Sequence, residues 1–61
     1  MDMEKMQRIM VLRKKQGWDG AYVEGELTAM MWLLENEGKT PEDIAKRTLQ
    51  EDWLSFVATF V

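Results

Sequence analysis

This chain of 61 residues contains neither cysteine nor histidine, so it lacks disulfides and the commonest zinc ligands. Domains of this size bury only about 60% of the surface that their unfolded chains expose, and many depend on a disulfide, a metal or self-association for added stability. One hydrophobic core must therefore hold the whole fold, and residues 1–61 are predicted to form a single domain. Self-association or a partner protein is the expected source of further stability.

The composition is that of a folded and soluble domain, with 46% hydrophobic and 31% charged residues. No apolar run approaches the roughly 18 residues of a membrane span. The charged start, Met1 to Lys5, does not lead into the uninterrupted apolar segment of a signal peptide. These features predict a cytoplasmic protein that does not enter the membrane.

The charges are unevenly distributed along the chain. Residues 1–16 contain five basic and two acidic residues, whereas residues 17–38 contain five acidic residues and no basic one. Residues 39–61 contain three basic and four acidic residues, and the net charge of the whole chain is −3. This asymmetry favours a head-to-tail contact or a partner with a basic surface over general binding to a phosphate backbone, although solvated helix faces would show it too.

Glycine and proline mark two boundaries. Gly17-Trp18-Asp19-Gly20 is typical of a turn. Near residue 40, Gly38 suits the left-handed position that follows a helix, Thr40 can cap the next helix, and Pro41 suits its first turn. A helix is therefore predicted to end at about Gly38 and another to begin at about Pro41.

The segment between these two boundaries has the apolar spacing of an α-helix. Its large apolar residues form one stripe, which consists of Val23, Leu27, Met30, Met31 and Leu34. The opposite face carries three small residues and a tryptophan, namely Ala21, Gly25, Ala29 and Trp32. Small residues permit close approach of another backbone, so we predict a homodimer with this face near its two-fold axis. The alternative is that a further element of the same domain covers the face.

The last twenty residues are predicted to form two helices. In one unbroken helix Ile44 would point away from the stripe formed by Trp53, Phe56, Val57 and Phe60, whereas a break near residues 48–50 lets both face one core. The sequence Thr48-Leu49-Gln50-Glu51 fits a capping box at the start of the second helix.

The N-terminal segment allows two structures. Met3, Met6, Ile9 and Met10 favour an amphipathic helix, because Met, Lys, Arg and Gln are good helix formers. Residues 9–12 could instead form a strand that pairs with residues 21–24. The predicted class is therefore a small all-α domain of three or four helices, with an α+β fold containing an N-terminal hairpin as the alternative.

Catalytic chemistry has few candidate residues in this chain. Histidine and cysteine are absent, and there is one tyrosine. Glu24 and Glu26, like Glu35 and Glu37, are two residues apart and so point to different sides of a helix. We therefore expect no enzymatic activity, no catalytic or metal site and no cofactor.

Residues 27–57 resemble a helix-turn-helix domain. The run from Leu34 to Arg47 contains an apolar helix ending in Glu-Gly, a threonine cap and an inward Ile-Ala pair, and residues 52–57 hold the place of the recognition helix. The resemblance implies a trihelical C-terminal half and a DNA-binding function. However, residues 52–61 contain no basic residue, unlike a recognition helix, and Glu51 and Asp52 would meet the phosphates.

A second resemblance is to small antirepressors that mimic the dimerisation helices of a repressor. It rests on residues 40–44, Thr-Pro-Glu-Asp-Ile, which follow the helix that carries Leu27, Met30, Met31 and Leu34. This resemblance implies a protein partner instead of DNA.

Three tryptophans and six methionines exceed what one small core normally needs. Trp53 shares a stripe with Phe56 and Phe60 and is expected in the core, whereas Trp18 and Trp32 are better interface anchors. The predicted interface with a partner or a second copy consists of Trp18, Ala21, Gly25, Ala29 and Trp32.

The leading functional hypothesis is a small non-enzymatic regulatory protein, of the phage or bacterial inhibitor type, that binds a larger protein and inhibits or redirects it. The alternative is a DNA-binding helix-turn-helix regulator. Its nucleic-acid contacts would come from basic residues that no common spacing unites, namely Arg8, Arg13, Lys14, Lys15, Lys46 and Arg47.

Overall fold

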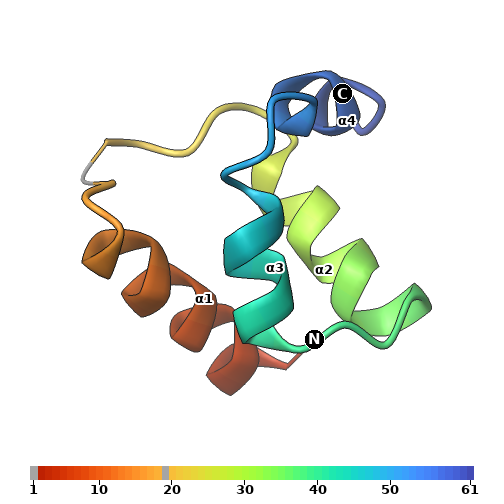
Figure 1. Cartoon of the computed structure of the whole chain (residues 1–61). Helices are drawn as coiled ribbons and strands as arrows, with labels where there is room; N and C mark the ends of the chain where they lie inside the picture. Colours follow the sequence, from red (N-terminus) through yellow and green to blue (C-terminus); the bar gives the residue numbers. More distant parts are fainter. Residues whose placement is uncertain (1, 19) are drawn as a thin grey trace.

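The computed structural model describes residues 2–18 and 20–61 and contains four α-helices within them (Figure 1). They are α1 (Met3–Lys15), α2 (Glu26–Asn36), α3 (Pro41–Arg47) and α4 (Trp53–Ala58). The described part of the chain forms no strand, so the all-α class is confirmed and the hairpin alternative is wrong. None of these helices has the length and apolar character that crossing a bilayer requires.

Helix α1 begins and ends as its sequence favours. The Asp2 side chain accepts a hydrogen bond from the backbone N–H of Lys5, at 3.1 Å, and caps the first turn. At the other end Gly17 adopts a φ of 93°, and the Trp18 N–H donates to the Arg13 carbonyl in a Schellman motif. The predicted turn thus begins at Gly17, while its third residue, Asp19, lies outside the described residues.

Helix α2 begins later than the apolar spacing predicted, and a different face is buried. Val23 precedes the helix, and both Val23 and Leu27 are exposed. Met30 is in the core, and Met31 and Leu34 pack against its edge. The buried face of α2 consists of Glu26, Ala29, Met30 and Leu33. The predicted stripe was therefore wrong by part of a turn.

The predicted boundary between α2 and α3 is confirmed. Gly38 has a φ of 61°, the Thr40 hydroxyl accepts a hydrogen bond from the Asp43 N–H at 3.1 Å, and Pro41 occupies the first turn of α3.

The predicted break between α3 and α4 is also confirmed, but the capping box is wrong. Thr48 closes α3 by donating its hydroxyl to the Ala45 carbonyl at 2.6 Å, and α4 begins only after Asp52. Both Ile44 and Trp53 consequently reach the same core.

Helix α3 lies between α1 and α2, and α4 packs against α2 beside its start (Figure 1). The core at their junction consists of Met6, Ile9, Ala29, Met30, Leu33, Ile44, Trp53 and Val57. Every helix contributes to this set, so the described residues share one core. Two charged side chains, Arg13 and Glu26, are also buried, and they organise the candidate site.

Candidate functional site

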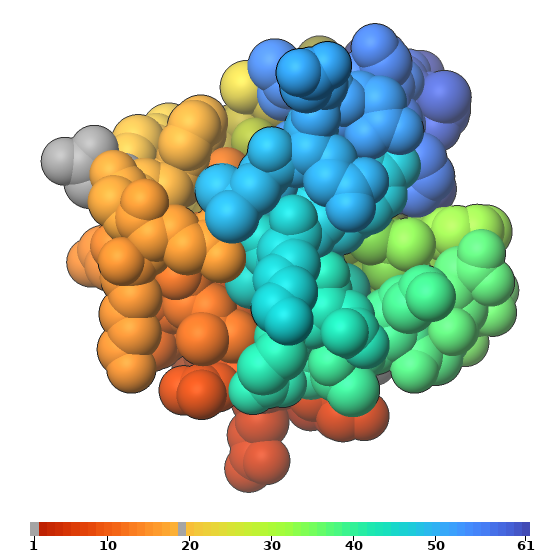
Figure 2. Space-filling model, viewed as in Figure 1, coloured from red at the N-terminus to blue at the C-terminus, as the bar shows by residue number. Residues whose placement is uncertain are grey.

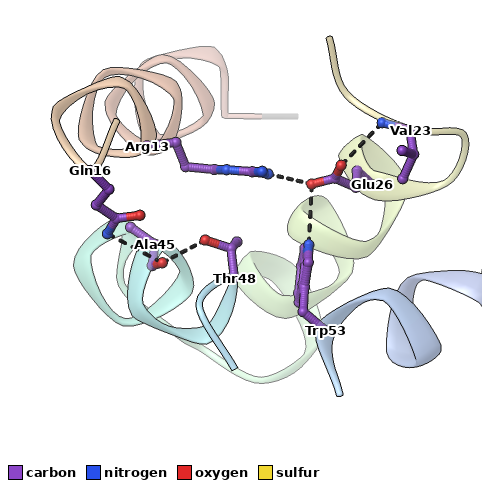
Figure 3. Close-up of polar contacts among 7 residues, drawn as sticks. All are labelled: Arg13, Gln16, Val23, Glu26, Ala45, Thr48 and Trp53. Carbon is purple, nitrogen blue, oxygen red and sulfur yellow. Dashed lines mark hydrogen bonds and ion pairs between the residues drawn. The ribbon is translucent and has the colours of Figure 1, made fainter. Parts of the chain in front are cut away.

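A buried ion pair joins α1 to α2 in the interior of the domain (Figure 3). Arg13 donates through Nη1 to Oε2 of Glu26, and both side chains are almost completely buried. The same Oε2 atom accepts a hydrogen bond from the Trp53 indole at 3.1 Å, and Oε1 accepts one from the Val23 N–H at 3.0 Å. The Glu26 carboxylate therefore connects α1, the loop before α2, and α4.

Burial by itself raises the pKa of Glu26, but hydrogen bonds from Arg13, Val23 and Trp53, together with the charge of Arg13, outweigh it and hold the pKa below its usual range. The carboxylate is thus ionised near neutral pH, with both oxygens engaged. It acts as a structural acceptor for three hydrogen bonds in the interior.

The lowered pKa of Glu26 predicts a loss of stability in acid. The contribution of Glu26 is fully present above the pKa of an unfolded glutamate and is lost as the pH falls through the lower folded value. We expect ¹³C-detected NMR to show that the Glu26 carboxyl titrates below the ordinary range of a glutamate, together with the onset of acid unfolding. Titration of Glu26 within or above that range would contradict the ion pair.

Arg13 also holds two aromatic side chains in the loop after α1. Its guanidinium carbon lies 4.5 Å from the ring centroid of Trp18 and 4.8 Å from that of Tyr22. Both distances are within the range of cation–π attraction. Burial raises the pKa of the Tyr22 hydroxyl. The loop is therefore anchored to the buried pair by its aromatic rings and by the backbone bond from Trp18 to Arg13.

These aromatic rings form one wall of a groove of about 460 Å³ on the outer face of α1, which we call the Trp18 groove. Its lining consists of Gln7, Met10, Val11, Lys14, Trp18, Gly20 and Tyr22. Val11 and Trp18 are 46% and 42% exposed, so a second molecule can reach their apolar surfaces. The arrangement offers an apolar contact surface in which the aromatic anchor is already in position.

The structure separates the five residues predicted to form one interface. Trp18 and Ala21 are exposed, but Ala29 has 0% exposure inside the core and cannot contact a partner, so its assignment is corrected. Gly25 packs against Val57 and the C-terminal residue, and Trp32 contacts Phe56 and Phe60 through ring centroids 6.3 and 5.8 Å away. Residues from α4 and from the segment after it therefore pack on Gly25 and Trp32 of the predicted dimer face, while Trp32 keeps 37% exposure.

The six basic residues of the nucleic-acid alternative do not form one free set. Arg13 is buried against Glu26, which corrects its assignment as a nucleic-acid contact. Arg8 pairs with Glu42 at 3.3 Å, and Arg47 pairs with Asp52 at 2.7 Å. Lys14, Lys15 and Lys46 are exposed. Half of the predicted set is thus engaged with carboxylates of the same chain.

Sequence reasoning missed the ion pair, although a signal was present. Arg13 continues the spacing of Met6 and Ile9, and Glu26 lies three and four residues before Ala29 and Met30. Opposite charges at core positions of two helices indicate a buried pair. Tyr22 and Val11 gave no comparable signal, because only the path of the loop brings them to one groove.

Comparison with protein-family models, with curated proteins and with solved structures found no match to this chain. The resemblances to helix-turn-helix domains and antirepressors therefore stay predictions.

Proposed function

We propose that this chain is a small non-enzymatic regulatory protein that binds a larger protein through the Trp18 groove and inhibits or redirects it. The observation that carries the proposal is the half-exposed Trp18, which is held over a groove by a buried arginine.

Trp18 is already held in position before a partner binds, and this preorganisation favours binding. A free aromatic side chain on a loop loses conformational freedom when it docks, and this loss reduces affinity. Here the Schellman motif and the Arg13 guanidinium already restrict Trp18, so less freedom remains to be lost. Tryptophan anchors commonly dominate the energetics of protein interfaces.

The lining also indicates the chemistry of the partner surface. Met10, Val11 and Trp18 offer an apolar surface, and methionine adapts to the shape of its contact. Lys14 supplies one positive charge at the groove. A partner segment with apolar side chains and a nearby carboxylate fits this lining.

The test compares two exposed apolar residues on helices. Val11, in the groove, is 46% exposed, and Leu27, which does not line it, is 41% exposed. We expect Val11→Glu to weaken binding at least about tenfold, or about 1.4 kcal/mol, because a carboxylate would be buried in an apolar contact. Leu27→Glu makes the same change of charge and should retain binding. Mass spectrometry would quantify the partners that each variant recovers from bacterial lysate. Calorimetry would then measure the affinity of each variant for the most abundant partner.

If a partner still binds the Val11→Glu variant but no longer binds the Leu27→Glu variant, the binding surface lies outside the groove, which contradicts our proposal. For the nucleic-acid alternative, a mobility-shift titration against a random duplex library is the matching experiment. Sequence-selective binding near physiological salt would favour a DNA-binding regulator and contradict our proposal.

A further inference from the structure

A second hollow lies between α2, α3 and α4, and its volume is about 580 Å³ (Figure 2). We call it the Trp32 cleft. The buried residues Leu33 and Ile44 contribute to its lining, as do the aromatic rings of Trp32 and Phe56. Trp32 is 37% exposed, and its contacts with Phe56 and Phe60 fix the orientation of its ring. The cleft therefore offers a preformed aromatic wall, and it shares no lining residue with the Trp18 groove.

Charged side chains surround this apolar surface. The lining includes three basic residues, Lys39, Lys46 and Arg47, and two acidic residues, Glu37 and Asp43. Arg47 is engaged, because it binds Asp52 through both terminal nitrogens and lies 4.9 Å from the Phe56 ring centroid.

The two lysines of the cleft differ from Arg47. Among residues 2–18 and 20–61, no carboxylate lies within 4.0 Å of the ammonium group of Lys39 or Lys46. Their positive charges are thus free to meet an anionic group that enters the cleft.

We infer that the Trp32 cleft binds a protein segment that presents a large apolar side chain beside a single carboxylate. The apolar group would pack on Trp32 and Phe56, while the carboxylate would lie near Lys39 and Lys46. The acidic lining residues Glu37 and Asp43 oppose a ligand with several negative charges, as does the net charge of −3. This balance favours a carboxylate over a polyphosphate or nucleic acid.

The experiment uses the whole chain and two small probes that differ in one group. N-acetyl-L-tryptophan carries a carboxylate, whereas N-acetyl-L-tryptophan amide has the same ring without the charge. In ¹H–¹⁵N NMR titrations we expect the acid to bind at least about threefold more tightly than the amide. Addition of the acid should cause the largest chemical-shift changes at the Trp32 indole N–H and at the backbone N–H groups of Leu33 and Lys39.

Charge variants then assign the difference to the cleft. The double change Lys39→Gln and Lys46→Gln should reduce the affinity for the acid to that for the amide, with little change for the amide itself. Both side chains are exposed, so the fold should persist, which the dispersion of the NMR spectrum checks. Lys15→Gln, on α1 and outside the cleft lining, is the matched control and should leave the preference intact.

Three results would overturn the inference. Equal affinities for acid and amide would remove the role of the lysines. Shifts centred on Trp18 and Tyr22 would place the probe in the other groove. Tighter binding of inorganic pyrophosphate than of N-acetyl-L-tryptophan would show that the cleft prefers polyanions. The proposed function is tested through Val11 on another surface, so either proposal can fail alone.

Discussion

Glu26→Gln is expected to destabilise the domain by about 3–5 kcal/mol, because it leaves the buried Arg13 guanidinium without a countercharge. A domain of this size rarely has more than about 3–5 kcal/mol of stability from its core. We therefore expect most molecules of this variant to be unfolded at 25 °C. Far-UV circular dichroism at 25 °C would measure the folded fraction of the variant, and a urea titration would measure the stability of the original chain.

A double variant distinguishes the missing countercharge from a general loss of packing. Arg13→Met combined with Glu26→Gln removes both charges and keeps an oxygen that can accept from Val23 or Trp53. Removing both charges leaves no unpaired buried ion, but the glutamine oxygen can serve only one of the two oxygen positions, so this variant should recover part of the lost stability. Single and double variants of equal stability would show that the charge balance is not what Glu26 contributes.

The same double variant tests whether the buried ion pair contributes to binding through the Trp18 groove. Without the guanidinium, Trp18 and Tyr22 lose their cation–π partner while the fold is retained. Binding through the Trp18 groove should weaken, because the aromatic anchor is then less restricted before docking.

Much of the fold follows from local signals in the sequence. Gly38, Thr40 and Pro41 specify the boundary between α2 and α3, because each acts on its own backbone conformation or on a neighbour within three residues. The break before α4 was predictable because only a break lets Ile44 and Trp53 face one core.

The buried face of α2 was not predictable in the same way. Apolar residues occur on both sides of this helix, so spacing alone does not say which side is buried. Leu27 gave an apolar signal but is exposed, whereas Glu26 gave a polar signal but is buried. The buried side depends on the elements that pack against α2, which are α3 and α4, with Val57 of α4 at the start of the helix.

The site was only partly predictable for a related reason. Trp18 stood out because it lies in the predicted glycine turn and belongs to no helical stripe. Its partner Arg13 is close in sequence, but the contacts from Glu26 to Arg13 and Trp53 join residues 13 and 27 positions apart. Periodicity within one element carries no information about such contacts.

Gly25→Ala is expected to destabilise the domain by about 2–4 kcal/mol, because it strains the backbone at this position and crowds α4. Gly25 caps α2 with a φ of 91°, where a non-glycine residue costs about 1–2 kcal/mol. An added Cβ would also lie 3.0 Å from Cγ2 of Val61 and 3.1 Å from the carbonyl oxygen of Val57. Because the latter is a backbone atom, α4 itself would have to move, at a further cost of about 1–2 kcal/mol.

Gly17→Ala provides the matched control for this prediction. Gly17 has nearly the same backbone conformation, with a φ of 93°, but an added Cβ there meets nothing within 4 Å. Its substitution should therefore show the conformational cost alone. The extra loss of unfolding free energy in Gly25→Ala, measured by urea titration of both variants, then reports the packing of α4 on α2. Equal losses in the two variants would mean that α4 shifts at this contact without a measurable cost in free energy, and that its packing does not stabilise the start of α2.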